Sequence, residues 1–118
     1  MAYLRQDNLV IPQGATWAVR WPLEGYQEAG ISDFTGWAVR SHVRRQITSA
    51  EILHEWSSVL GNAVIEDSYI ELRVSAEESS AWTWFRNQAV YDVELVSPGG
   101  EVFRVTQGTI TVSPEVTR

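Results

Sequence analysis

Apolar and polar residues alternate most regularly in segment 89–111, near the C-terminus. Tyr91, Val93 and Leu95 alternate with acidic residues, which is the two-residue period of a strand with one buried face. The sequence Ser-Pro-Gly-Gly at 97–100 is typical of a turn, because proline fixes φ and glycine permits a positive φ. A second alternating run follows the turn. The pattern therefore predicts a β-hairpin.

Further apolar runs have the length and composition of strands. They lie at 9–11, 15–23, 36–45, 52–56, 63–65 and 69–74. The inward residues of the three longest runs are expected to be Trp17, Val19, Trp21, Leu23, Trp37, Val39, Val43, Ile70, Leu72 and Val74. Segment 24–34 contains two glycines and an aspartate and is predicted to be a loop.

Two local signals interrupt the strand pattern. Ser75 and Glu78 have the spacing of a capping box, which predicts one short helix near 75–84. In the last strand the inward positions change from odd (Phe103) to even (Ile110), so one extra residue must shift the face. We expect a β-bulge at Gln107-Gly108.

Seven to nine short strands with one helix favour an all-β fold, an antiparallel immunoglobulin-like β-sandwich, over a barrel. We expect an N-terminal arm at 1–8 and a single sandwich domain at 9–118. The arm is either frayed or docks on a neighbouring subunit through Tyr3 and Leu4. If strand 36–45 pairs with the strand that starts at Ala89, Arg40 and Arg44 would lie opposite Asp92 or Glu94.

Composition narrows the class of protein. The 118 residues are 44% apolar, which is enough to fill one core. The chain has no cysteine, so it can form neither a disulfide nor a thiolate metal site. Its net charge of −6, with nine arginines and no lysine, argues against a nucleic-acid partner. No apolar run reaches eighteen residues and no signal peptide is visible, so we expect no membrane segment.

The sequence holds little that predicts catalysis. His42 and His54 each lack a second metal-ligating residue at suitable spacing, so no metal site is expected. The carboxylate pairs Glu66-Asp67 and Glu77-Glu78 are typical of a turn and of a helix N-terminus. No phosphate-binding or nucleophile motif is present. We therefore predict no enzyme activity, no catalytic residue and no cofactor.

Six tryptophans in a chain of this length are many. Those within strands are most simply core residues. Trp82, Trp84 and Phe85 lie between strands, and two interpretations remain open for them. They cap one end of the sandwich, or they form an aromatic patch that contacts a protein partner or a sugar ring, with Tyr26 as a further stacking residue.

Several segments in order resemble a family of small tailed-phage virion domains. They are DFTGW at 33–37, YDVEL at 91–95 and QGTITVSPEVT at 107–117, and the resemblance covers about residues 9–117. The family comprises β-sandwich modules of the long-tail-fibre C type, which are similar to the N-terminal domain of baseplate upper proteins. The family has no catalytic residues to carry over.

The resemblance implies a structural protein located in the virion and assembled in the host cytoplasm. Its partners would be other phage structural proteins at the tail, the baseplate or fibre, or the head surface, where it would act as adaptor or capsid decoration. Because a freestanding domain gains avidity from many copies, we expect an oligomer or a symmetric lattice. The alternative is a carbohydrate-binding module that uses exposed Trp and Tyr side chains.

Overall fold

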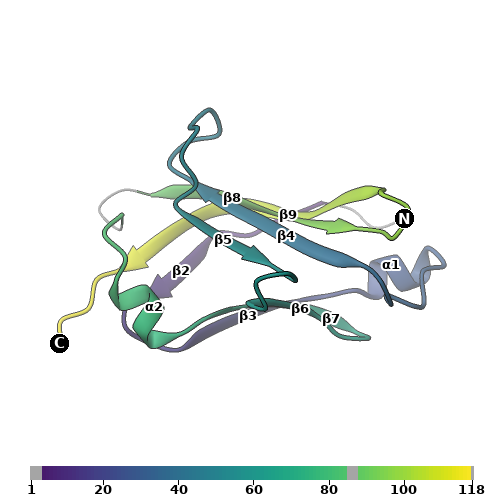
Figure 1. The fold of residues 1–118 in the computed structure, drawn as a ribbon, viewed down its shortest axis with the longest axis horizontal. Coiled ribbons are helices and arrows are strands. Elements are labelled where there is room, and N and C mark those ends of the chain that lie inside the picture. The colour runs from purple at the N-terminus through teal and green to yellow at the C-terminus, as the bar shows by residue number, and fades with distance from the viewer. Residues whose placement is uncertain (1–3, 85–87, 118) are drawn as a thin grey trace.

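Two β-sheets pack face to face in a computed structural model, which describes residues 4–84 and 88–117 (Figure 1). The larger sheet contains β1 (Arg5–Gln6), β2 (Leu9–Pro12), β4 (Ala38–Arg44), β5 (His54–Ser57), β8 (Ala89–Val96) and β9 (Val102–Ser113). The smaller sheet contains β3 (Trp17–Pro22), β6 (Ala63–Ile65) and β7 (Tyr69–Val74). The short helices α1 (Glu24–Glu28) and α2 (Ala76–Ser80) lie at opposite ends of the sheets (Figure 1). The predicted all-β sandwich is thus confirmed as a two-sheet, mainly β fold.

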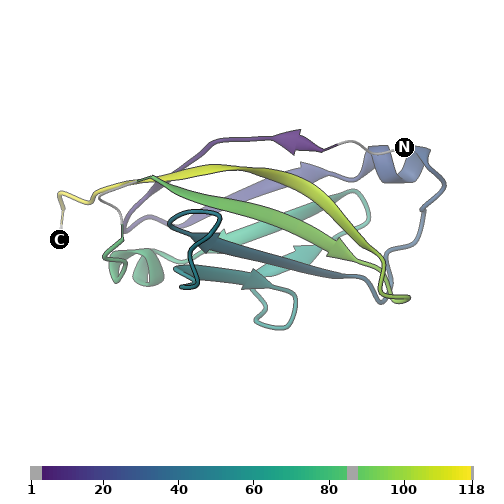
Figure 2. The same cartoon turned by 90° about the horizontal axis from the view of Figure 1, so that it is seen from above.

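The strand order follows from hairpins and crossovers. The larger sheet runs β1-β9-β8-β4-β5, with β2 also paired to β9, and the smaller sheet runs β3-β7-β6. In the described part of the chain, neighbouring strands pair antiparallel, except that β1 and β2 run parallel to β9. Figure 2 shows the N-terminal segment running beside β9 along one border of the larger sheet.

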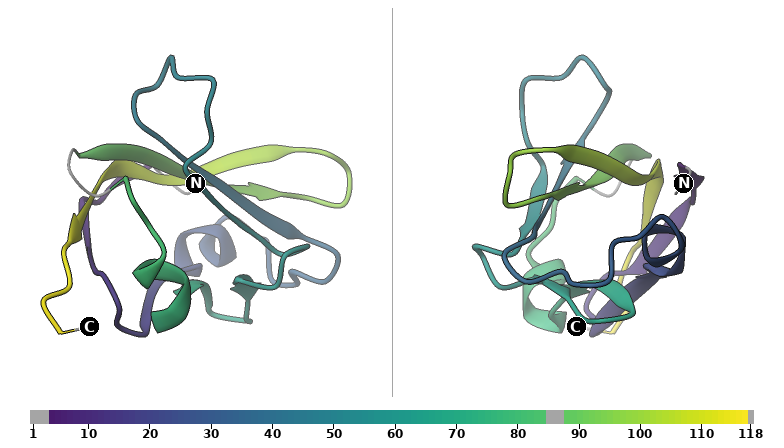
Figure 3. Two further views of the ribbon diagram at one scale, coloured as in Figure 1. Left: turned by 60° about the vertical axis from the view of Figure 1, so that its left-hand side comes forward. Right: turned by 90° about the vertical axis from the view of Figure 1, so that its right-hand side faces the viewer.

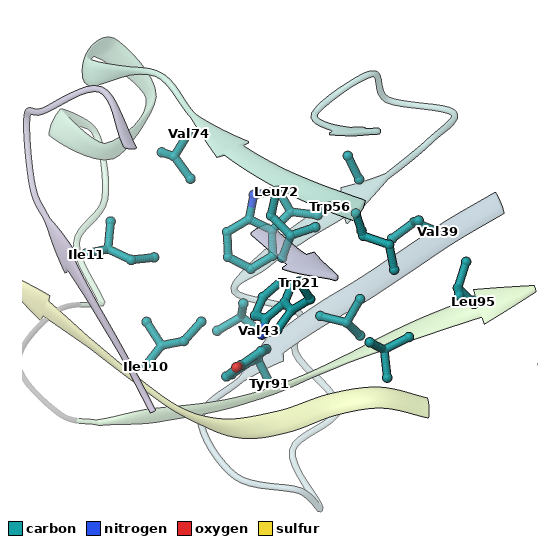
Figure 4. Packing of buried hydrophobic residues seen from close by; sticks show 14 of the residues in the cluster. Ile11, Trp21, Val39, Val43, Trp56, Leu72, Val74, Tyr91, Leu95 and Ile110 are labelled. Carbon is teal, nitrogen blue, oxygen red and sulfur yellow. The ribbon is translucent and has the colours of Figure 1, made fainter. Parts of the chain in front are cut away.

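The core lies between the sheets and contains the predicted alternating residues. Tyr91, Val93 and Leu95 are at most 4% exposed, and Ile70, Leu72 and Val74 are equally well buried. Trp56 is fully buried in the same layer, where its indole Nε1 donates a hydrogen bond to the carbonyl of Arg73 at 3.0 Å (Figure 4). Each such aliphatic side chain contributes about 1.5–3 kcal/mol relative to exposure.

The N-terminal segment differs from the predicted arm, because residues 5–12 pair with β9 within the same chain. Asp7 connects this segment to both sheets. Its carboxylate accepts a hydrogen bond from Nε1 of Trp21 at 2.7 Å, and its carbonyl accepts one from the hydroxyl of Tyr91 at 2.8 Å. Of the two docking residues proposed for the arm, Leu4 is 45% exposed and Tyr3 lies outside the described residues.

The predicted hairpin is confirmed, but the irregularity in β9 lies earlier than expected. The register shifts between Val93 and Glu94, opposite Val105 and Thr106, which are both buried. The bulge is therefore at Val105-Thr106 and not at Gln107-Gly108. Position 108 requires glycine for another reason, because a Cβ there would collide with the carbonyl oxygen of Asp7.

One helix was predicted, and the described residues form two. Ser75 caps α2 as expected, with its Oγ accepting from the Glu78 amide at 3.1 Å, although α2 ends at Ser80 and is shorter than predicted. α1 lies within the segment that we predicted as a loop. Its N-cap residue makes no side-chain cap hydrogen bond, and five residues are too few to show a helical period. Burial of Tyr26 anchors this turn.

Candidate functional site

The aromatic residues proposed as partner contacts lie mainly inside the protein. Tyr26, Trp82 and Trp84 are only 7–8% exposed, and Phe85 lies outside the described residues. The hypothesis of an exposed stacking platform at Trp82, Trp84 and Tyr26 is therefore wrong. The physical reason is mutual packing: the rings of Trp82 and Trp84 lie 4.9 Å apart, and Trp82 also contacts His54 at 5.1 Å.

His54 occupies the centre of this aromatic cluster at the α2 end. Its ring meets Trp56 edge-on at 4.5 Å. Burial lowers the pKa of His54, and the nearby carboxylates of Glu78 and Glu55 oppose the shift only in part. Within the described part of the chain, Nε2 of His54 and Nε1 of Trp84 are buried without a hydrogen-bond partner. Burial at this packed end therefore favours the neutral form of His54.

The outer face of the smaller sheet is dominated by one internally satisfied ion cluster. Glu71 is 5% exposed and pairs with Arg73 and, at 2.6 Å, with Arg20, whose guanidinium also lies 4.3 Å from the ring centroid of Tyr69. Arg73 and then Arg20 hold the pKa of Glu71 below its usual range. Two guanidiniums share this one carboxylate, so the cluster keeps one net positive charge, and the side chains of Arg20 and Arg73 remain 61% and 52% exposed.

The outer face of the larger sheet carries two parallel rows of opposite charge. The basic row is on β4 and the acidic row on β8, and the register places Arg40 opposite Glu94 and His42 opposite Asp92. Nε of Arg40 lies 2.7 Å from Oε1 of Glu94, which confirms the expected pairing for Arg40. Arg44 lies opposite Val90 instead of an acid, so the expectation for Arg44 is wrong.

Asp92 is less well compensated than its neighbour Glu94 on this face. Its nearest cation is Arg104, with Nε 3.7 Å from Oδ2, and no hydrogen bond to its carboxylate is found among the described residues. Partial burial, followed by the negative charge of Glu94, raises the pKa of Asp92. A further positive charge above this carboxylate would be favourable.

A loop at 45–53 stands out above the same face (Figure 3). Arg44 fixes its base by donating hydrogen bonds from one guanidinium nitrogen to the carbonyls of Ser49 and Ala50, at 2.9 and 2.8 Å. At the tip, the Gln46 amide donates to Oγ of Ser49 and the Ser49 amide donates back to the Gln46 carbonyl, both at 3.0 Å. This closed turn presents Ile47 with 87% of its surface exposed.

The loop and the sheet face border an open concavity of about 490 Å³. Its lining combines charged side chains with the apolar Ile47 and Val90. In the described residues no group of three metal-ligating side chains is found, and neither histidine has a hydroxyl hydrogen-bonded to it. The arrangement can form ion pairs and an apolar contact, which suits recognition of a surface.

The edges of the sheets are partly closed to added strands. On β5 the side chain of Asn62 takes the place of a neighbouring strand: Oδ1 accepts from the Ser57 amide at 2.8 Å, and Nδ2 donates to the Glu55 carbonyl at 2.9 Å. On β3, Pro22 offers no donor. An exposed edge invites pairing with another chain, so these residues discourage it.

Sequence reasoning missed Ile47, Arg44 and Asn62 as functional candidates. The apolar Ile47 within the polar segment Arg-Arg-Gln-Ile-Thr-Ser was the only available signal for the loop. The roles of Arg44 and Asn62 depend on contacts with backbone carbonyls and amides, which no residue pattern encodes.

In the described residues, no helix is long and apolar enough to cross a membrane. No model of a known protein family matches the chain, and no curated protein matches its sequence.

Proposed function

We propose that this chain is a non-enzymatic structural domain of a tailed-phage virion, which docks on the tail, baseplate, fibre or head surface. The observation that carries the proposal is the distribution of side chains. Large aromatic and aliphatic residues fill the space between the sheets, and the ionisable residues with described partners pair mainly across the outer faces. Such a domain offers rigid surfaces for assembly.

We also propose that the two sheets have an immunoglobulin-like topology. With strands lettered A to G in chain order, such a fold groups C, F and G in one sheet and B, E and D in the other. Here β4, β8 and β9 are neighbours in the larger sheet, and β3, β7 and β6 form the smaller one. β5 extends the larger sheet beyond β4, as an extra strand after C does in variable-type domains.

The sequence resemblance supports the virion as the location, and the charge supports protein partners. A chain of net charge −6 repels phosphate backbones, so the proposed partners are other structural proteins. Many copies on a symmetric surface would convert weak contacts into stable attachment.

The test is to purify virions from the host that carries this gene and to quantify the chain by mass spectrometry across a density gradient. The proposal expects the chain to sediment with intact particles at a constant ratio to the other virion proteins. A chain found only in the soluble host fraction would overturn it.

A separate measurement addresses the carbohydrate alternative. The purified chain is titrated with oligosaccharides while tryptophan fluorescence is recorded. Since Trp82 and Trp84 are buried, no saturable change is expected. A saturable change that Trp82→Ala abolishes would favour the sugar-binding alternative.

A further inference from the structure

We infer that the outer face of the larger sheet binds a second copy of this chain through a two-fold axis between β4 and β8. The occupant follows from the charge pattern of the face. Among its described outward residues, Arg40, Arg44 and Arg104 balance Glu55, Asp92 and Glu94, whereas the whole chain carries −6. Two copies therefore repel one another less on this face than over the chain as a whole.

The two charged rows are complementary to themselves. A rotation of 180° about an axis that lies on the face, between β4 and β8 and along the strands, places each row over the opposite row of the second copy. Because Arg40 is level with Glu94 and His42 with Asp92, the rotation keeps these levels aligned. Arg40 of one copy then faces Glu94 of the other, and the reverse contact forms at the same time.

The two partners of the central ion pair are accessible enough for this contact. The side chains of Arg40 and Glu94 are 54% and 22% exposed. Asp92 has its nearest cation, Arg104, at 3.7 Å, and the second copy brings the guanidinium of its Arg40 to the same row. Electrostatic complementarity of this kind mainly fixes register and specificity, so the affinity needs an apolar contribution.

The loop at 45–53 supplies that contribution. It rises beside the face (Figure 3). The concavity below it is lined by Ile47, Val90 and Thr109 among others. In the two-fold arrangement the loop of each copy lies against the β8–β9 side of the other. Since hydrogen bonds already fix the turn around Ile47, little conformational entropy is lost when it binds.

The decisive experiment exchanges charges between copies. Sedimentation equilibrium of the wild-type chain should give a mass that rises with concentration from 13.3 kDa toward twice that value. Arg40→Glu and Glu94→Arg should each be monomeric, because each places like charges across the two-fold axis. An equimolar mixture should recover the dimer, since every cross-copy pair then joins opposite charges.

Mixing separates this effect from damage within one chain, because a second molecule cannot repair a pair inside the first. Circular dichroism spectra of both variants should match the wild type. A wild-type chain that stays monomeric at every concentration overturns the inference, and so does a mixture that remains monomeric.

A second pair of variants tests the loop without changing the rows. Ile47→Asp should weaken association at least tenfold. Val59→Asp is the matched control, because Val59 is a 94% exposed apolar residue on another loop, outside the concavity. Equal effects of the two substitutions, or none from Ile47→Asp, would assign the dimer to a different surface. The inference does not rest on the virion proposal, since a dimer in solution requires no particle.

Discussion

Aromatic side chains close both ends of the sandwich, but the two clusters differ in chemistry. The cluster at the α1 end consists of Tyr26, Phe34, Trp37 and Phe103, with neighbouring ring centroids 5.4–5.9 Å apart. The cluster at the α2 end consists of Trp17, His54, Trp56, Trp82 and Trp84, at 4.5–6.3 Å. The first contains no titratable group near neutral pH, whereas the second encloses an imidazole.

Both ends are closed by aromatic packing, but the stability of the two ends should respond differently to pH and to substitution. At the α1 end two of the rings, Trp37 and Phe103, are only partly buried and therefore lie close to the solvent. At the α2 end Trp17 is also partly buried, but Trp56 is 0% exposed, and two ring nitrogens of this cluster lack partners within the described residues. The α2 end should therefore contribute more packing energy and also depend more on pH and on single nitrogen atoms.

Trp56→Ala should produce the largest loss. Trp56 is 0% exposed, contacts Trp17 and His54, and donates a hydrogen bond to the Arg73 carbonyl. Truncation of a buried Trp costs about 3–5 kcal/mol of unfolding free energy. Urea denaturation of the variant measures the cost, and a loss below about 1 kcal/mol would show that the cluster collapses into the cavity.

Phe103→Ala tests the α1 end in the same assay. Phe103 contacts both Tyr26 and Trp37 at 5.9 Å, but it is only partly buried. The expected loss is about 1–3 kcal/mol, because less surface leaves water and the cavity is open. A loss that equals or exceeds that of Trp56→Ala would reverse the proposed ranking of the two ends.

The sequence predicted the strands because each has one buried face. Period-two alternation located β8 and the inward residues of β3, β4 and β7, and the Ser75 cap located α2. The pattern failed where packing depended on distant atoms. The face change in β9 was visible, but its position was not, because Gly108 accommodates Asp7, which is distant in sequence.

The candidate site was much less predictable than the fold. Aromatic residues between strands suggested a binding patch, yet Trp82 and Trp84 are buried because His54 and α2 lie beside them. The charged rows follow from cross-strand register, and only the pairing of Arg40 with an acid was anticipated. Exposure of a residue between strands depends on tertiary packing, which local composition does not encode.

The unfolding free energy should depend on pH through the α2 end, which contains His54. The expected change is smaller than the loss from Trp56→Ala or Phe103→Ala. The pKa of His54 is lowered in the folded protein from 6.5, so the unfolded chain takes up the proton first. The contribution of His54 is therefore fully present above pH 6.5 and is lost as the pH falls from 6.5 through the lower folded pKa. Urea denaturation at pH 7.5, 6.5 and 5.5 should show this decline.

His54→Phe is the matched variant, because it keeps an aromatic ring against Trp56 and Trp82 but cannot titrate. The difference in unfolding free energy between the variant and the wild type should grow in favour of the variant as the pH falls. His42→Phe on the open sheet face controls for the loss of a histidine. A constant difference across the three pH values would contradict the role of His54.

The smallest expected effect comes from replacing single indole nitrogens within the α2 cluster. Trp84→Phe removes a buried donor that has no partner among the described residues, whereas Trp56→Phe removes one that is bonded to the Arg73 carbonyl. Both changes remove the same atoms, and the two sites differ in the hydrogen bond and in burial, since Trp56 is 0% and Trp84 7% exposed. A net protein hydrogen bond contributes about 0.5–1.5 kcal/mol, and an unpaired buried donor is itself unfavourable.

Trp84→Phe should therefore cost about 1 kcal/mol less than Trp56→Phe in urea denaturation at pH 7.5. Equal costs would mean that Nε1 of Trp84 finds a partner in solution, and the two ends would then differ through His54 alone.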